Sequence, residues 1–278
     1  MHYEEAKPGP AAGRFVQCYW MLTGPPGTSG VRRIVPDGCP ELIVNFGDAF
    51  ESWDGANWSI QPRRFVAGQI TGPMLVRPTG SVKLCGIRFR PYGAGPILNA
   101  PIHELTGCVA ELNALAPRVW RELEQLDATG PFTAISGLLD RVMANRVSGS
   151  NDLMASITDE IASTGGAIDI AGLAAQAGLS SRQMERRFKS AVGIPPKLFC
   201  RIQRFQRVFQ VMESERGSWI DAALNCGYYD QAHLIRDFRE FAGETPSVLL
   251  SGKTDLAAEF LQYRSASHSS NTESARSL

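Results

Sequence analysis

One pattern occurs twice in this sequence, as L-A-A-Q-A-G-L-S at residues 173–180 and as A-A-L-N-C-G-Y-Y at residues 222–229. After each copy an apolar residue, a phenylalanine, a glycine and a proline recur fifty residues apart, in the pairs Met184 and Leu234, Phe188 and Phe238, Gly193 and Gly243, and Pro196 and Pro246. A solenoid needs at least about three stacked units to bury a continuous core. Two units instead predict a duplicated small module.

Each copy has the signals of two helices joined by a tight turn. Side chains that cap helix N-termini stand at Asp169, Ser180 and Asp230, and a glycine that permits the turn stands at Gly178 and Gly227. Helices are predicted over 170–177 and 181–192 in the first copy, and from Ser218 or Trp219 to the turn and from 231 to about 242 in the second. Each copy is therefore predicted to be a helix-turn-helix unit.

Two more helices complete this region. One is predicted from Asn151 or Asp152 to about Ser163, where Gly165 and Gly166 end it. The other begins at Pro196 and connects the two copies. Its apolar residues recur at helical spacing and are predicted to be core, namely Leu198, Ile202, Phe205, Phe209 and Met212.

Positive charge is concentrated in the first copy and the connecting helix. The whole chain is neutral, with 28 Lys+Arg and 28 Asp+Glu, but residues 182–207 hold eight basic residues against one acidic residue, Glu185. On a helical wheel of about 100° per residue, Met184 marks the buried direction and Arg182, Arg186 and Lys189 point away from it. An arginine can donate two hydrogen bonds to guanine in a major groove, and a lysine can neutralise a phosphate.

The second copy presents a less charged outward face. Its core side is marked by Leu234, Phe238 and Phe241, and its outward and flanking positions are Gln231, Ala232, Ile235, Arg236 and Arg239. A basic helix face is usually only solvated, but two copies in register favour DNA binding. Because fewer hydrogen-bonding groups converge on the second face, we expect Arg182 and Arg186 to dominate base choice.

Several neighbouring polar residues have ordinary interpretations. Glu185 is expected to pair with a nearby arginine, and His233 to be a surface histidine. The connecting-helix residues Arg201, Arg204 and Arg207 are expected to be solvated or paired within the protein rather than bound to phosphate.

Residues 152–250 resemble the DNA-binding domain of the AraC/XylS family of transcription regulators. The matching stretches are L-A-A-Q-A-G-L-S-S-R-Q-M-E-R-R-F-K with G-I-P-P, and A-A-L-N-C-G-Y-Y-D-Q-A-H-L-I-R-D-F-R-E-F with G-E-T-P. The resemblance implies an all-α domain of two helix-turn-helix units joined by a long helix, whose recognition helices enter successive major grooves of double-stranded DNA. It also implies contact with RNA polymerase if the protein is an activator.

The resemblance also implies which residues contact DNA. Carried over position by position, base contacts fall on Arg182, Glu185 and Arg186 in the first unit and on Gln231, Ala232, Ile235 and Arg236 in the second. The sequence departs from the usual pattern at Tyr228, commonly phenylalanine, and at Ala232 and His233. From the helical wheel and the positive helix N-terminus, phosphate contacts are expected at Ser180, Lys189 and Arg239.

Residues 1–107 have a different composition. They contain 12 of the 17 prolines and 15 of the 27 glycines, which break helices and separate short strands. Strands are predicted over 15–22, 42–46, 74–77 and 82–90, with a bulge at Gly86, where the alternation changes phase. The phrases R-R-I-V-P-D-G-C-P-E-L-I-V-N-F and G-I-R-F-R-P-Y-G-A resemble cupin-like sensor domains of the same family. The resemblance implies a β-rich barrel that senses a small-molecule effector, but assigns no ligand-binding residue.

Residues 108–147 are predicted to be helical, and Pro117 either splits the first stretch into two helices or begins the second helix. An apolar stripe recurs at helical intervals at Leu112, Leu115, Val119, Leu123 and Leu126. This stripe either packs on the barrel as a helical layer or forms part of a homodimer interface. The boundary to the DNA-binding region is placed at V-S-G-S-N, residues 147–151, and the serine-rich residues 251–278 are predicted to be a disordered tail.

Cysteine usage predicts a cytoplasmic protein. The six cysteines are far apart and form no C-x-x-C pair, and no signal peptide opens the chain, so free thiols are expected at Cys18, Cys39, Cys85, Cys108, Cys200 and Cys226. The four histidines do not stand at ligand spacing, so neither a metal nor another cofactor is expected. No apolar run reaches the length of about 18 residues that suggests a membrane span.

The sequence thus predicts an α+β protein, a β-rich cupin-like barrel with a helical layer followed by an all-α double helix-turn-helix region. We expect a sequence-specific transcription regulator rather than an enzyme. The alternative is a small-molecule-processing cupin-like enzyme with an appended DNA-binding domain, for which Asp37, Cys39 and Glu41 in P-D-G-C-P-E are candidates, although a Pro- and Gly-rich turn also explains them. A third interpretation makes the amino-terminal part an oligomerisation module only.

Overall fold

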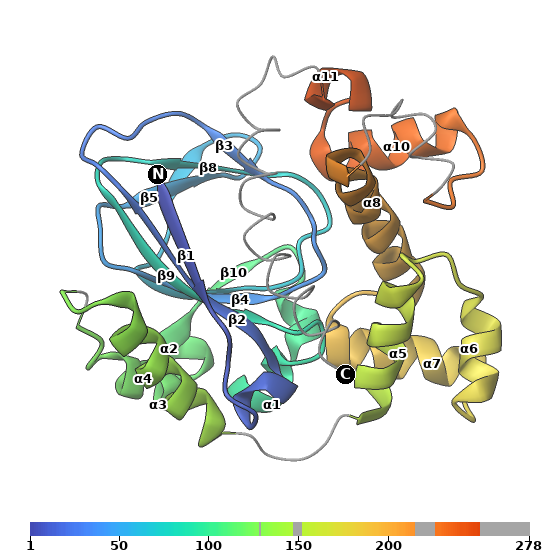
Figure 1. Ribbon diagram of the computed structural model, residues 1–278, viewed down its shortest axis with the longest axis horizontal. Coiled ribbons are helices and arrows are strands. Elements are labelled where there is room, and N and C mark those ends of the chain that lie inside the picture. Colours follow the sequence, from blue (N-terminus) through green and yellow to red (C-terminus); the bar gives the residue numbers. More distant parts are fainter. Residues whose placement is uncertain (128, 147–151, 215–225, 251–278) are drawn as a thin grey trace.

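The computed structural model describes residues 1–127, 129–146, 152–214 and 226–250. A β-rich amino-terminal region lies beside a helical carboxy-terminal region (Figure 1), which is the α+β architecture expected from the sequence. The boundary placed at 147–151, the helix expected near Trp219 and the tail at 251–278 fall outside the described residues. None of the helices in the described ranges is long and apolar enough to cross a membrane.

The β-rich region consists of two antiparallel sheets. The larger sheet has the strand order β1 (His2–Ala6), β2 (Val16–Gly24), β9 (Val82–Phe89), β4 (Glu41–Asn45), β7 (Arg64–Ala67) and β10 (Val109–Glu111). The smaller sheet has the order β3 (Arg32–Ile34), β8 (Met74–Pro78), β5 (Phe50–Trp53) and β6 (Trp58–Ile60). The four predicted strands correspond to β2, β4, β8 and β9. Within the described part of the chain, neither sheet closes on itself.

The central strands β2 and β9 bury apolar residues on both faces. One face joins the main core, with Tyr19, Met21, Cys85, Ile87 and Phe89. The other face joins a smaller core between the two sheets, with Cys18, Trp20, Leu22 and Val82 packed beside Phe50 and Val76 of the smaller sheet. The two sheets therefore face each other across this smaller core.

The bulge predicted at Gly86 is wrong. Gly86 pairs in regular register with Trp20 on one side and Ile43 on the other, and the irregularity in this sheet lies between Val16 and Cys18 instead. The apparent phase change arises because β9 is apolar on both faces. A glycine is needed at this position because a Cβ atom would lie 2.1 Å from the indole of Trp20.

Helices α2 (Leu112–Leu115), α3 (Pro117–Leu123) and α4 (Phe132–Ala144) flank the larger sheet (Figure 1). Pro117 begins α3, as predicted. The helical assignment of residues 109–111 is wrong, because they form strand β10 and pair with β7. The predicted stripe lies in or against the main core. Packing on the sheet therefore accounts for the stripe, and a dimer interface would need other residues.

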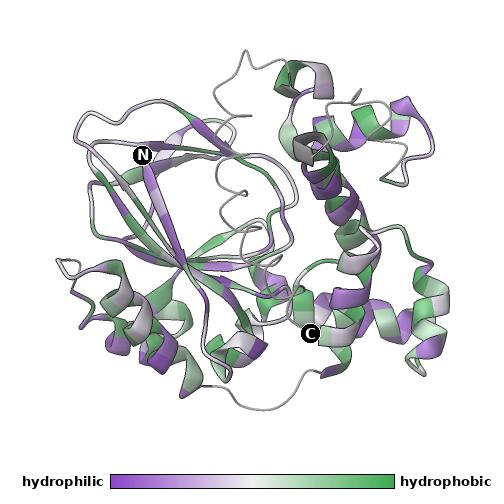
Figure 2. Cartoon of the chain, viewed as in Figure 1, coloured by the Kyte–Doolittle hydropathy of each residue, from purple (hydrophilic) through white to green (hydrophobic). Residues whose placement is uncertain are grey.

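The helical region comprises α5 (Asp152–Ser163), α6 (Ile170–Gln176), α7 (Ser181–Val192), α8 (Pro196–Ser214), α10 (Gln231–Ala242) and α11 (Pro246–Leu250). The helices carry both hydrophilic and hydrophobic residues along their length (Figure 2). Their apolar residues belong to the same main core as the sheet. On α8 the predicted Ile202, Phe205 and Phe209 are buried, and so are Phe199 and Val208. Because α8 packs against several elements, the buried part of its surface is wider than a single stripe of residues.

Candidate nucleic-acid interface

The first helix-turn-helix unit is formed by α6 and α7 and is fixed by local capping. The carboxylate of Asp169 accepts hydrogen bonds from the backbone N–H groups of Ala171 and Gly172 at 3.0 and 2.9 Å. At the start of α7, the Ser180 hydroxyl accepts from the Gln183 N–H at 3.3 Å, and the Gln183 side chain accepts from the Ser180 N–H at 2.9 Å. This reciprocal capping box satisfies two backbone donors that a helix start leaves free.

Helix α7 has one buried and one solvent-exposed face. Met184, Phe188 and Val192 are fully buried, and the Phe188 ring lies 5.6 Å from that of Phe199 on α8. The predicted DNA-contacting residues of this unit are all exposed, namely Ser180, Arg182, Glu185, Arg186 and Lys189. The helical wheel therefore assigned the faces of α7 correctly.

The charged groups of this face have no ion-pair partners within the described residues, so they are available to a ligand. The pairing expected for Glu185 with a neighbouring arginine is not observed there. The Ser180 hydroxyl acts as an acceptor in the capping box and still has its own proton to donate. A cap role and a phosphate contact are therefore compatible at Ser180.

In the second unit the structure describes the turn and the recognition helix α10. The Asp230 carboxylate caps α10 by accepting from the His233 N–H at 2.7 Å. Leu234, Phe238 and Phe241 are fully buried, as predicted. The DNA-contacting residues predicted for this unit are exposed at Gln231, Ala232, Arg236 and Arg239 and partly buried at Ile235.

The turn of the second unit holds one residue more than that of the first. One residue lies between Gly178 and the cap Ser180, whereas two lie between Gly227 and the cap Asp230. The added residue is Tyr229, whose side chain is 91% exposed beside the start of α10, while the preceding Tyr228 is buried. The sequence interpretation missed Tyr229 as a candidate contact, although the extra residue was visible when the two copies were aligned at their caps.

Arg201 of α8 binds the second recognition helix rather than solvent. Its guanidinium lies 2.8 Å from the Asp237 carboxylate and 2.5 Å from that of Glu240, and 5.0 Å from the centre of the Phe241 ring. The hydrogen bonds from Arg201 to Glu240 outweigh its burial and, with those to Asp237, raise its pKa. Of the two expectations for Arg201, solvated or paired within the protein, the structure shows the pairing.

The other two connecting-helix arginines also contact the protein. Arg204 donates a long hydrogen bond of 3.4 Å to the Gly227 carbonyl and lies over the Tyr228 ring, so it supports the second turn. The stem of Arg207 lies against Gly165, where a Cβ atom would be 2.3 Å from its Cδ. His233 is partly buried, with its ring 5.1 Å from that of Tyr228, rather than fully on the surface.

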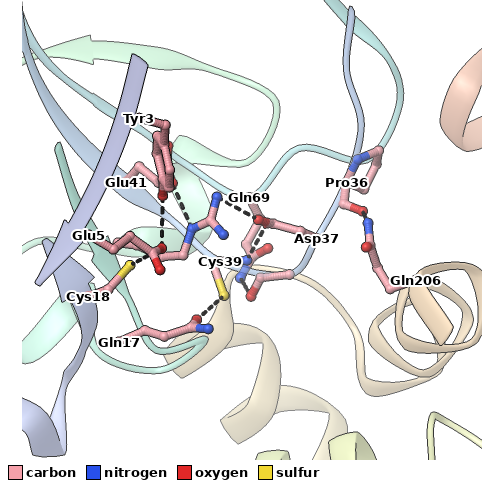
Figure 3. Close-up of polar contacts among 12 residues, drawn as sticks. Tyr3, Glu5, Gln17, Cys18, Pro36, Asp37, Cys39, Glu41, Gln69 and Gln206 are labelled. Atoms are coloured by element: carbon pink, nitrogen blue, oxygen red, sulfur yellow. Dashed lines mark hydrogen bonds and ion pairs between the residues drawn. The ribbon is translucent and has the colours of Figure 1, made fainter. Parts of the chain in front are cut away.

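A second polar cluster lies in the amino-terminal region (Figure 3). The guanidinium of Arg88 lies 2.8 Å from the Glu41 carboxylate and 3.3 Å from that of Asp37. Burial raises the pKa of Glu41 and opposes the charge on Arg88, but the two carboxylates outweigh this and raise the pKa of Arg88. The Cys18 thiol donates to Glu5 at 3.1 Å, and burial raises its pKa. This thiol is therefore a hydrogen-bond donor.

The P-D-G-C-P-E segment is a turn that carries this ion pair. The Asp37 carboxylate accepts from the Cys39 N–H at 2.9 Å, and Gly38 has a φ of 86°. The Cys39 thiol donates to the Gln17 side chain at 3.3 Å. Asp37, Cys39 and Glu41 are thus engaged in turn and ion-pair contacts, which supports the turn interpretation over a catalytic one. All six cysteines are free thiols, as expected.

Comparison with protein families agrees with the two regions of the fold. Residues 173–251 match the model of a helix-turn-helix domain, which covers both copies of the repeat. Residues 4–111 match a domain of unknown function, which covers the two sheets. No curated protein matches the chain in sequence.

Several solved structures resemble the chain over most of its length. ToxT from Vibrio cholerae matches at 11% identity over 83% of this chain and 98% of ToxT, with a TM-score of 0.45. Wild-type ToxT with bound unsaturated fatty acid, from Vibrio cholerae strain SCE256, matches at 14% identity over 83% and 94%, with a TM-score of 0.44. The AraC-like transcriptional activator CuxR matches at 11% identity over 72% and 78%, with a TM-score of 0.30. These scores are too low to support an argument about this chain.

Proposed function

We propose that the protein is a sequence-specific transcription regulator of the AraC type, which uses the helix-turn-helix domain at residues 173–251 to read two successive major grooves of double-stranded DNA. The observation that carries this proposal is the outward face of α7. It exposes Arg182, Arg186 and Lys189, which have no ion-pair partner among the described residues, on a helix whose opposite face is fully buried. Such a helix fits a major groove.

The proposed roles on α7 follow from side-chain chemistry. Arg182 and Arg186 lie one helical turn apart, so they can contact two neighbouring base pairs in the groove. Each guanidinium can donate two hydrogen bonds to one guanine. Lys189 and the Ser180 hydroxyl are proposed to bind backbone phosphates, with the positive N-terminus of α7 adding to the attraction at Ser180. Glu185 can accept from a cytosine amino group.

On α10 the proposed contacts discriminate bases less strongly. Gln231 can bind adenine, Arg236 can bind guanine, and the apolar Ala232 and Ile235 suit a thymine methyl group. Arg239 is proposed to bind phosphate. This half of the interface contributes affinity and spacing more than sequence choice.

Control by an effector is proposed at the amino-terminal region. The loop that holds Arg88 through Asp37 and Glu41 also accepts hydrogen bonds from α8, because the Gln203 amide donates to the Asp37 carbonyl and the Gln206 amide to the Pro36 carbonyl (Figure 3 shows Gln206 and Pro36). A small molecule or partner that changed the pairing of Arg88 would therefore act on the connecting helix. Contact with RNA polymerase and homodimer formation are further proposals that rest on the family resemblance.

The proposal is tested by fluorescence anisotropy on duplexes that the full-length protein selects from a random library. Arg186→Ala is expected to weaken binding by about 1–3 kcal/mol and to relax base preference at one position. Arg187→Ala is the matched control, because Arg187 is exposed on the same helix but is not assigned a base contact. Full sequence-specific affinity in Arg186→Ala would contradict the assignment of Arg186.

A further inference from the structure

The amino-terminal region contacts both helix-turn-helix units at the C-terminal ends of α7 and α10. The Thr106 hydroxyl donates a 2.7 Å hydrogen bond to the carbonyl of Gly193, which ends α7. Arg33 donates a 2.7 Å hydrogen bond to the carbonyl of Ala242, the last residue of α10. The C-caps Gly193 and Gly243 lie fifty residues apart in the repeat, so both recognition helices are held at the same end.

The contact with the first unit is closely packed. The 3-10 helix Ile102–Leu105 packs against α7. A Cβ atom at Gly193 would lie 3.2 Å from both the Gln69 side chain and the Thr106 hydroxyl, and Gly193 has a φ of 99°. Gln69 is fully buried and donates from its amide to the Gly38 carbonyl at 2.8 Å. The end of α7 is therefore fixed to the amino-terminal region.

The contact with the second unit places a cationic side chain at the C-terminus of α10. The Arg33 side chain is 18% exposed, and its second terminal nitrogen lies 3.7 Å from the Glu244 carboxylate. A cation at the last carbonyls of a helix is stabilised by the helix dipole. Pro73 lies 3.5 Å from the position of a Cβ atom on Gly243. Arg33 and Pro73 thus hold the end of α10.

A third contact lies between these two, on the connecting helix. A Cβ atom at Gly38 would lie 2.7 Å from the Phe199 ring of α8, so the loop approaches the helix as closely as a glycine allows. The amides of Gln203 and Gln206 bind the carbonyls of Asp37 and Pro36 in the same loop. Both recognition helices and the helix between them are therefore attached to one region.

These contacts leave the residues that are proposed to contact DNA bases exposed to solvent. Arg182 and Arg186 lie in the first half of α7, and Gln231 and Arg236 lie in the first half of α10, and all four are exposed. The amino-terminal region holds the opposite ends of both helices. The contacts therefore restrict how the two helices lie relative to each other without covering the exposed side chains of their first turns.

We propose that Arg33, Thr106 and the loop at residues 36–38 form a clamp that sets the relative position of the two recognition helices, and hence the spacing of the DNA site. Arg33 and Thr106 are positioning residues for DNA reading. This inference rests on the proposed function. Two linked binding modules gain affinity when the second is already placed for its site, because binding then orders less of the protein. Loosening the clamp should therefore weaken binding to two-part sites and leave single-part sites unaffected.

The test compares full-length variants on three duplexes derived from one selected two-part site. The first keeps both halves, the second randomises the half assigned to α10, and the third inserts base pairs between the halves. The clamp variants are Arg33→Ala and Thr106→Val. The controls are Arg77→Ala, on the smaller sheet beside Glu51 and Trp58, and Thr79→Val, whose hydroxyl binds the Ala49 carbonyl.

If the clamp acts as proposed, the preference of both clamp variants for the two-part over the single-part duplex should be about tenfold smaller than that of the wild type. Their affinity for the single-part duplex should equal that of the wild type. The inserted base pairs should weaken their binding less than that of the wild type. An unfolded variant would not keep single-part affinity. Unchanged spacing preference in both variants would overturn the clamp, and so would tighter binding to every duplex, which indicates an inhibitory contact. Absence of sequence-specific binding by the wild type would instead refute the proposed function.

Discussion

The two recognition helices have the same length and share part of their pattern of buried residues, but α10 also buries Asp237 and Phe241, and the two helices carry different charges. Helix α7 has four basic residues and one acidic residue, whereas α10 has two of each. Both acidic residues of α10, Asp237 and Glu240, bind Arg201 of the connecting helix. The charged side chains of α7 therefore face solvent, whereas part of the charge on α10 serves its attachment to α8.

The attachments to α8 differ in the same way. Phe188 of α7 meets one ring of α8, that of Phe199 at 5.6 Å. On the other side, Phe205 lies 4.9 Å from Phe238 and 5.4 Å from Phe241. Aromatic pairs at these distances add stability beyond their buried area. The second unit is thus tied to α8 by an aromatic cluster and an ion pair together.

Among the variants that distinguish the two units, Arg201→Ala is expected to lower the free energy of unfolding the most. The change would leave the Asp237 carboxylate, 2% exposed, without its charged partner, and breaking a pair of this kind costs about 3–5 kcal/mol. Because Arg201 itself is partly exposed, we expect the lower end of that range, measured by urea unfolding of the full chain. Arg187→Ala is the charge-matched control on α7, and a loss no larger than that of the control would contradict the structural role of Arg201.

The second comparison concerns DNA affinity. Arg186→Ala on α7 is expected to cost about 1–3 kcal/mol, and Arg236→Ala on α10 less than about 1 kcal/mol, because fewer hydrogen-bonding groups surround Arg236. Anisotropy on the same selected duplex at one salt concentration measures both. Equal losses would mean that the two units share base reading, which the charge difference between α7 and α10 does not predict.

The caps of the two recognition helices are expected to be nearly equivalent. Ser180→Ala removes the acceptor for Gln183, and Asp230→Ala removes the acceptor for His233, so each should lower the free energy of unfolding by about 1 kcal/mol. Chemical denaturation of the two variants side by side provides the measurement. If Ser180 also binds a phosphate, Ser180→Ala should weaken DNA binding about equally on every sequence and leave its salt dependence unchanged, because the hydroxyl carries no charge.

The smallest effect is expected at the extra residue of the second turn. Tyr229→Phe removes a hydroxyl from a side chain that is 91% exposed, so the melting temperature should not change. If the hydroxyl donates to a phosphate, affinity should fall by about 0.5–1.5 kcal/mol on every sequence alike. Anisotropy on several duplexes distinguishes this outcome from a sequence-dependent loss, which would indicate a base contact.

Within the described residues, the sequence predicted the bounds of the helices of the carboxy-terminal region closely because their signals are local. Asp169, Ser180 and Asp230 cap the helices that they were expected to cap, and the buried positions of α7 follow the helical period. The strands were harder to predict. In β9 the alternation of apolar and polar residues was obscured, because Val82 faces the small core while Ile87 and Phe89 face the main core. Both faces of the strand therefore carry apolar residues.

The contacts between regions had no signal in the sequence. Arg33 and Ala242 are 209 positions apart, and Thr106 and Gly193 are 87 apart. No periodicity or spacing connects such pairs, because they depend on how the sheets pack against the helices. The outward direction of Arg182, Arg186 and Lys189, by contrast, followed from the helix period alone, and their exposure on α7 is confirmed.

The most direct test of the account is selection of binding sites by the full-length protein from randomised duplex DNA. We expect a two-part site whose halves lie about one helical turn apart, roughly 10–10.5 base pairs. The half of the DNA site whose recognition is lost in Arg186→Ala should show the stronger base preference. The half whose recognition is affected by Arg236→Ala should show the weaker one. Enrichment of no sequence, or of a site whose stronger half responds to Arg236→Ala instead, would contradict the central claim that the first unit reads the sequence.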